Sequence, residues 1–230
     1  MNNINIFFVH GWAFDHSFWL PLQNEMIKKN LLFNYYFYDH GFFGKKISPK
    51  KKTYRGKNIF IVHSYGFNWL IKKNNLKIDL ILNFFGSPLF IDKDKKYNIQ
   101  KKTFQKMFSE LQIRPKYVLE KFYINCGLQR PFKFDEYNLN RLTFALKELY
   151  VENLTSKTRR FENKIFSIFS KNDKILRYRK FDNYFLNPKH KNLKVLDSSS
   201  HAMPYLKPSY CCEIIEIFIK NFLKKECYEK

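Results

Sequence analysis

The sequence predicts an α/β fold in which a mostly parallel sheet of about six strands carries helices on both faces. Three observations favour this class. Short apolar runs rich in β-branched and aromatic residues alternate with segments of helical periodicity. The chain has 230 residues, 45% of them hydrophobic, which is enough for one domain with a real core. Several strands end in polar or reactive residues, as at the carboxyl edge of open parallel sheets.

The first 85 residues contain four of the predicted strands. They cover Ile4 to Val9, Phe33 to Tyr38, Ile59 to Val62 and Asp79 to Phe85. Ser17 is expected to cap a helix after the first strand, because its hydroxyl can accept a backbone N–H of the first turn. Tyr65 to Lys73 is predicted to continue as a helix from the third strand.

From about residue 89 to residue 160 the pattern predicts helices only. Phe104, Met107, Phe108 and Leu111 recur at helical spacing, Pro115 suits the first turn of the next helix, and Asp135 is expected to cap a third. A helical insertion between two sheet strands is typical of a lid. We therefore expect one domain, with its core in residues 1–88 and 161–230 and a lid at about 89–160.

The chain returns to sheet structure after the insertion. Lys164 to Phe169 and Leu193 to Leu196 are the last two predicted strands. The final helix is expected to place Ile214, Ile217, Phe218 and Phe222 on one buried face.

Composition narrows the function classes. The net charge of +22 favours an acidic partner, but no nucleic-acid-binding motif occurs among the basic residues. The four cysteines and the histidines lack metal-ligand spacing, so we expect reduced thiols, no metal and no cofactor. No apolar run is long enough for a membrane span and the start lacks a signal pattern, which predicts a cytoplasmic protein.

The segment from Asn58 to Leu70 predicts a nucleophile. Ser64 stands between a buried strand and a helix, on a turn that pushes its hydroxyl out at the carboxyl end of the sheet. Gly66 keeps one of the two glycines usual in such an elbow, whereas Val62 occupies the place of the other. The backbone N–H of Tyr65, at the start of the helix, is a candidate oxyanion donor.

Two further reactive residues follow strand ends. Asp173 comes after the fifth predicted strand and His201 after the sixth, so that the order is Ser, Asp, His. His201 would remove the proton of Ser64, and Asp173 would hold the imidazole. Asp197 and Asp182 are rival candidates for the acid, with Asp173 preferred because it lies directly past its strand.

Other residues have narrower expected roles. The N–H of Trp12, after the first strand, is the second candidate oxyanion donor. The Trp12 indole and Phe122 of the insertion are candidates for substrate contact. We expect His10 to tie loops together and His63, which should point away from the nucleophile, to support the elbow.

The chain resembles the α/β-hydrolase superfamily over almost its whole length. Within it, His10-Gly11-Trp12, His201-Ala202-Met203-Pro204-Tyr205 and the lid segment Pro115 to Phe122 are similar to the pimeloyl-acyl-carrier-protein methyl ester esterases of biotin synthesis (BioH type). The resemblance implies hydrolysis of that methyl ester by Ser64, Asp173 and His201, with Trp12 and Tyr65 as oxyanion donors. It also implies an acidic acyl-carrier protein as partner, for which Arg114, Lys116, Lys121 and Arg130 are candidate contacts.

Other functions stay open at this point. A general carboxylesterase or thioesterase would use the same three residues on small metabolites. An inactive hydrolase fold that serves as a binding module, or a nucleic-acid binder, would need none of them. We expect a monomer.

Overall fold

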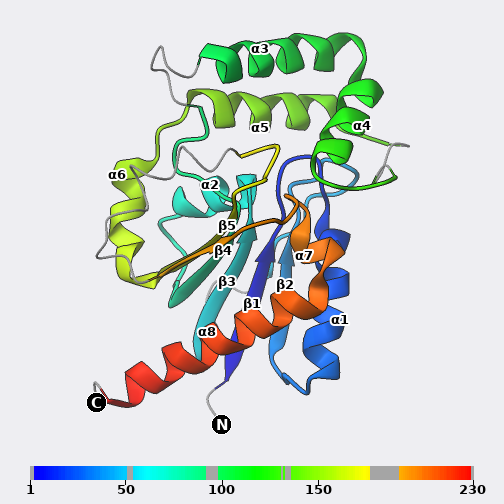
Figure 1. The fold of residues 1–230 in the computed structure, drawn as a ribbon. Coiled ribbons are helices and arrows are strands. Elements are labelled where there is room, and N and C mark those ends of the chain that lie inside the picture. The colour runs from blue at the N-terminus through cyan, green and yellow to red at the C-terminus, as the bar shows by residue number, and fades with distance from the viewer. Residues whose placement is uncertain are drawn as a thin grey trace.

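The computed structural model describes residues 3–50, 54–91, 98–130, 132, 136–176 and 192–228, apart from the side chains of 98–100 and 225–228. Six parallel strands form one sheet in the order β2-β1-β3-β4-β5-β6 (Figure 1). Their bounds are β1 Ile4–Val9, β2 Asn34–Tyr38, β3 Lys57–His63, β4 Leu80–Phe84, β5 Ile165–Ser170 and β6 Leu193–Leu196. The predicted fold class is confirmed.

Helices cover both faces of the sheet (Figure 1). Helices α1 (Leu20–Lys28) and α8 (Pro208–Tyr228) lie on one face, while α2 (Tyr65–Ile71) and α6 (Thr155–Thr158) lie on the other. The short helix α7 (Met203–Leu206) precedes α8, and two 3-10 turns span His16–Trp19 and Arg159–Lys164.

Strand alternation divides the core into two layers. In β1, Ile6 and Phe8 are buried in the cluster that α1 and α8 cover, whereas Phe7 and Val9 belong to the cluster beneath α2. Both sets are almost fully buried, as expected for a parallel strand between two helical layers. The sheet is therefore packed on both faces up to the carboxyl ends that carry the candidate site residues.

The segment between β4 and β5 contains α3 (Asn98–Ile113), α4 (Pro115–Asn125) and α5 (Leu139–Val151). These helices lie beyond one end of the sheet (Figure 1). Helix α5 is fixed to the turn after β2. The backbone N–H of Asn138 donates to the Phe42 carbonyl oxygen at 2.8 Å, and the Arg141 guanidinium donates to the Gly41 carbonyl oxygen at 3.1 Å.

The helix caps differ from those that the sequence suggested. The Asp15 carboxylate, not Ser17, caps the first helical turn, and it accepts both the N–H and the hydroxyl of Ser17. Asn138 caps α5 by accepting the Arg141 N–H at 3.0 Å, while Asp135 lies outside the described residues. At the first position the carboxylate that precedes the turn reaches its free N–H group.

The predicted buried face of the final helix is also partly wrong. Ile217 is 54% exposed, whereas Ile215 and Ile219 are buried. The helix therefore turns a slightly different face to the sheet than the apolar stripe predicted.

None of the described helices is long and apolar enough to cross a membrane. Cys126, Cys211 and Cys212 are buried free thiols, as expected, and the side chain of Cys227 lies outside the described part of the chain. Burial raises the pKa of the Cys126 thiol well above its usual value, and nearby Asp173 adds to the effect, so this thiol stays protonated.

Candidate active site

Ser64 sits on a strained turn between β3 and α2. Its φ of 49° and ψ of −118° are in a region that costs a non-glycine residue about 1–3 kcal/mol. The turn brings α2 so close to β1 that a side-chain carbon at Gly66 would lie 2.5 Å from the carbonyl oxygen of Val9. Val62, at the place of the other usual glycine, is fully buried in the layer beneath α2. The strain and the close packing together give the geometry of a nucleophile elbow.

Asp173 and His201 form a buried pair at the ends of β5 and β6. One carboxylate oxygen of Asp173 accepts the backbone N–H groups of Ile175 and Leu176 at 2.8 and 3.1 Å. The other accepts the Nδ1–H of His201 at 2.7 Å. This bond places the proton on Nδ1 and leaves Nε2 as an acceptor.

The His201 Nε2 atom is buried and has no hydrogen-bond partner among the described residues, so the Ser64 hydroxyl does not reach it with bonding geometry. The two residues are nonetheless neighbours, because the ring of His63, adjacent to Ser64 in the chain, lies 4.8 Å from the His201 ring. Without substrate, hydrogen bonds between a nucleophile and its base are often long or poorly aligned.

Hydrogen bonds also join the loops that carry these residues. The Ser170 hydroxyl accepts the Ser199 N–H at 2.8 Å, which ties the Asp173 loop to the His201 loop. The Ala202 N–H donates to the Cys126 carbonyl oxygen at 3.0 Å and so fixes the same loop to α4.

The two candidate oxyanion donors flank Ser64. A side-chain carbon at Gly11 would lie 3.1 Å from Ser64 Cβ, so the loop after β1 passes directly over the serine. Trp12, the next residue, lines the same cavity as Ser64. Tyr65 begins α2, where the first backbone N–H groups have no acceptor within the helix.

Helix α5 holds the side chains of both these residues. The Trp12 indole donates to the Leu142 carbonyl oxygen at 2.8 Å, and the Tyr65 hydroxyl donates to the Glu148 carboxylate at 2.5 Å. Burial, reinforced by the bond to Glu148, raises the pKa of the Tyr65 phenol far above its ordinary value. Lys72 also donates to Glu148, so the contact is a small, partly buried network.

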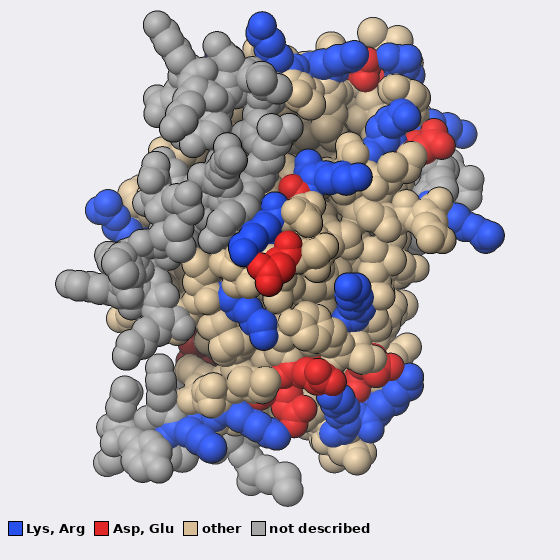
Figure 2. Space-filling view, in the orientation of Figure 1, with Lys and Arg blue, Asp and Glu red and all other residues tan. Residues whose placement is uncertain are grey.

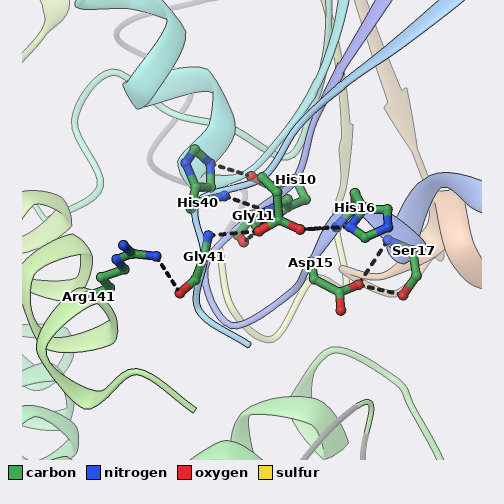
Figure 3. A network of polar contacts seen from close by, with 9 residues as sticks. His10, Gly11, Asp15, His16, Ser17, His40, Gly41 and Arg141 are labelled. Atoms are coloured by element: carbon green, nitrogen blue, oxygen red, sulfur yellow. Dashed lines mark hydrogen bonds and ion pairs between the residues drawn. The ribbon is translucent and has the colours of Figure 1, made fainter. Parts of the chain in front are cut away.

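A second network supports the loop after β1 from the end of β2, as Figure 3 shows. The carboxylate of Asp39, the first residue after β2, accepts the backbone N–H and the ring Nδ1–H of His16 at 2.9 and 2.8 Å. It also accepts the backbone N–H of Gly41 at 2.7 Å. His10 Nε2 accepts the His40 N–H at 3.1 Å, and the His40 ring donates back to the His10 carbonyl oxygen at 3.1 Å. His10 thus ties loops together, as expected.

Burial would raise the pKa of Asp39, but the adjacent His10 imidazole and the backbone N–H groups of His16 and Gly41 outweigh it and hold this pKa well below its usual range. The sequence reasoning missed Asp39. Its position directly after a strand, shared with Asp173, is the signal that could have found it. No group of three His, Cys, Asp or Glu in the described part of the chain is arranged to hold a metal ion.

The Asp39→Asn substitution should lower the free energy of unfolding by about 2–3 kcal/mol at pH 7, because an amide cannot accept all these bonds. The folded-state pKa of Asp39 is depressed, so its contribution is present above the unfolded value, about 3.9, and declines as the pH falls below it. Urea unfolding at pH 7, 5 and 3 should show the gap between variant and parent narrowing only at pH 3. A gap that stays constant to pH 3 would contradict this account.

A cavity of about 280 Å³ opens above Ser64. Its interior is mostly apolar, and Trp12 and Phe122 meet there edge to face with ring centroids 4.8 Å apart. Charged side chains also line it: Lys106, Lys121, Lys174 and Glu110, the last paired with Arg114 at 2.7 Å. The remaining lining residues are Phe90, Ile91, Thr103, Phe104, Met107, Tyr117, Val118, Asn125, Leu146, Leu149, Ile175 and Leu176.

The other sequence candidates are not part of the Ser64, Asp173 and His201 group. Asp197 pairs with Lys171 at 2.6 Å and has a side chain 91% exposed, so it does not contact His201. Asp182 lies outside the described residues. Arg114, Lys116, Lys121 and Arg130 are exposed on or beside α4. The His63 ring contacts the backbone carbonyl of His201.

Comparison with known proteins gives the fold. No family model and no curated protein sequence matches the chain. Among solved structures, an esterase from Exiguobacterium antarcticum is similar, with a TM-score of 0.74 at 13% identity, over 96% of this chain and 93% of that one. MenH from S. aureus has a TM-score of 0.67 at 13% identity, over 97% and 96%. An E-2-(acetamidomethylene)succinate hydrolase has a TM-score of 0.66 at 16% identity, over 96% and 92%.

The sheet order, the strained serine after β3 and these similarities define the class: the chain has the α/β-hydrolase fold. The three structures share this architecture with the chain at identities too low to carry over a substrate.

Proposed function

We propose that the protein is a serine hydrolase that cleaves carboxylic esters through an acyl-enzyme intermediate. The observation that supports this most directly is the strained Ser64 in an apolar cavity, beside a buried His201 whose tautomer is set by Asp173. An unpartnered Nε2 at that position is what a general base for the serine hydroxyl requires.

The reaction follows from these roles. His201 Nε2 takes the Ser64 proton as the hydroxyl oxygen attacks the ester carbonyl carbon, and the Asp173 carboxylate stabilises the imidazolium. The N–H groups of Trp12 and Tyr65 stabilise the oxyanion, and each is worth about 3 kcal/mol of barrier lowering. His201 then protonates the leaving alcohol, and water, activated by the same imidazole, releases the acid.

We further propose that the ester is the methyl ester of a pimeloyl group on an acidic acyl-carrier protein, in the cytoplasmic synthesis of biotin. The apolar cavity suits a hydrocarbon acyl chain. Lysines at the cavity and the exposed basic residues of α4 suit an acidic partner, and Figure 2 shows basic side chains over the lid helices at the top of the molecule.

The carrier hypothesis is tested by salt. KM for the carrier-bound ester should rise roughly tenfold between low and moderate ionic strength, since exposed ion pairs are screened, whereas hydrolysis of neutral p-nitrophenyl butyrate should barely change. The combined variant Arg114→Ala, Lys116→Ala, Lys121→Ala should reproduce the rise in KM at low salt. Lys220→Ala on α8, far from the lid, is the matched control.

The outcomes separate the candidate functions. If KM for both esters is unaffected by salt, the substrate is a small metabolite and not a carrier-bound ester, as for a general carboxylesterase or thioesterase. If the protein hydrolyses neither ester and a fluorophosphonate does not label Ser64, the fold serves as a binding module and not as an enzyme. Restored growth without biotin of a bacterium lacking its own pimeloyl-ester esterase would support the pathway directly.

A further inference from the structure

His63 is the residue that joins the nucleophile to the base. It is the last residue of β3, covalently next to Ser64, and its side chain is fully buried. Its ring Nε2 lies 3.0 Å from the His201 carbonyl oxygen, 138 residues further along the chain. Since a carbonyl oxygen can only accept, Nε2 carries the proton and donates it.

The ring of His63 is held from several sides. Phe18 stacks on it with centroids 4.6 Å apart, and Phe14 and Phe85 meet it edge-on at 5.6 and 6.4 Å. On the side of the loop after β1, a side-chain carbon at Gly11 would lie 2.6 Å from His63 Nδ1. Only a glycine can approach the ring so closely, so the imidazole is tightly packed on this side as well.

His63 also stays neutral. Burial lowers its pKa well below the ordinary histidine value, and the neighbouring His201 lowers it further, which outweighs the opposing effect of the bond to the His201 carbonyl. The ring is therefore a constant single donor, and it adds no positive charge beside the imidazolium that His201 would form in the reaction. The remaining Nδ1 has no hydrogen-bond partner among the described residues.

We propose that His63 is a positioning residue for the reaction: its Nε2–H holds the backbone of His201 at a fixed distance from Ser64. This inference rests on the proposed function. Asp173 fixes the far end of the His201 imidazole and the Cys126 carbonyl fixes the following N–H. Those contacts come from other loops, whereas His63 is adjacent to Ser64 in the chain and so connects the base directly to the nucleophile.

This role explains an otherwise unfavourable arrangement. A buried imidazole with one unpartnered nitrogen is destabilising, and an apolar side chain would fill the same space without that cost. An apolar residue would leave the His201 carbonyl without its donor and the catalytic loop free to shift. A shift of about 1 Å in a catalytic group can cost roughly 100-fold in rate.

The test compares two side chains of similar length. In His63→Gln the amide N–H can still reach the His201 carbonyl oxygen, whereas His63→Met fills the space and donates nothing. We expect His63→Met to lower kcat for p-nitrophenyl butyrate by about 10- to 100-fold with KM nearly unchanged, and His63→Gln to retain kcat within about threefold. His63→Asn, whose shorter amide falls short of the carbonyl, replaces the methionine variant should that one not fold.

A measurement that does not depend on activity separates the positioning role of His63 from the proposed hydrolase function. The Nδ1–H of His201, bonded to Asp173, should give a downfield proton resonance that persists in His63→Gln and broadens through exchange in His63→Met. Equal losses of kcat in both variants, or a sharp resonance and unchanged kcat in His63→Met, would overturn the role of His63. A parent that cleaves no ester yet shows the resonance change would refute the proposed function and leave the positioning contact standing.

Discussion

Ser64→Ala is expected to lower kcat/KM for p-nitrophenyl butyrate by about 10⁴- to 10⁶-fold, the range found when a nucleophile that acts with a base is removed. The methyl group occupies the same strained turn, so the sheet, α2 and the cavity should be retained. The substitution removes one hydroxyl that forms no hydrogen bond with the His201 Nε2. Fluorophosphonate labelling, detected by mass spectrometry, should be lost together with activity.

Thermal unfolding serves as the control for the fold, and the melting temperature of the alanine variant should stay within a few degrees of the parent. Ser198→Ala is a matched variant, because Ser198 is exposed in the loop that leads to His201. It should retain full activity and full labelling. Activity that survives in Ser64→Ala at the level of the parent would remove Ser64 from the reaction and with it the proposed function.

Asp173→Asn should lower kcat by about 10⁴-fold, as in other enzymes where the acid of such a triad becomes an amide. The physical reason is the tautomer of His201. In the parent, the carboxylate accepts the Nδ1–H at 2.7 Å, so Nε2 is free to take the serine proton. An amide N–H directed at Nδ1 would favour the opposite tautomer, with its proton on Nε2, and the base would be blocked. KM should change little, because Asp173 is not among the residues that line the cavity.

The matched variant for this prediction is Asp197→Asn. Asp197 lies in the same region of the chain, but its exposed carboxylate pairs with Lys171. An exposed pair contributes little to stability or geometry, so activity should remain within about twofold of the parent. A large loss in Asp197→Asn with a small loss in Asp173→Asn would reverse the assignment of the acid.

Much of the fold followed from local patterns in the sequence. β1 spans the predicted residues Ile4–Val9, and the strands of the second half deviate by one residue at most. A buried parallel strand is apolar on both faces, so its run of β-branched and aromatic residues ends where the polar loop begins. The same boundaries placed Ser64, Asp173 and His201 at one edge of the sheet, because all six strands are parallel.

The rest depends on contacts between distant residues. His63 was expected to support the elbow, but no local pattern predicts that its ring meets the backbone of His201, 138 residues further along the chain. No pattern in the sequence predicts that the Glu148 carboxylate bonds the hydroxyl of Tyr65, 83 residues earlier. The short helices α6 and α7 have too few residues for a periodic pattern, so only the surrounding structure determines them.

The attachment of α5 limits how far the insertion can vary independently. Its Leu142 carbonyl and Glu148 carboxylate hold the side chains of Trp12 and Tyr65, whose backbones are the candidate oxyanion donors. Exchanging the whole insertion for that of another enzyme would alter substrate preference and disturb the transition-state contacts at once. The end of α4 is attached as well, because the Cys126 carbonyl accepts the Ala202 N–H and the Tyr123 hydroxyl donates to the Ala13 carbonyl oxygen. A chimera that keeps α4 and α5 and replaces only α3, which lines the cavity, separates the two effects. The natural point of recombination in this protein therefore lies inside the insertion, between α3 and α4, and not at its junctions with the sheet.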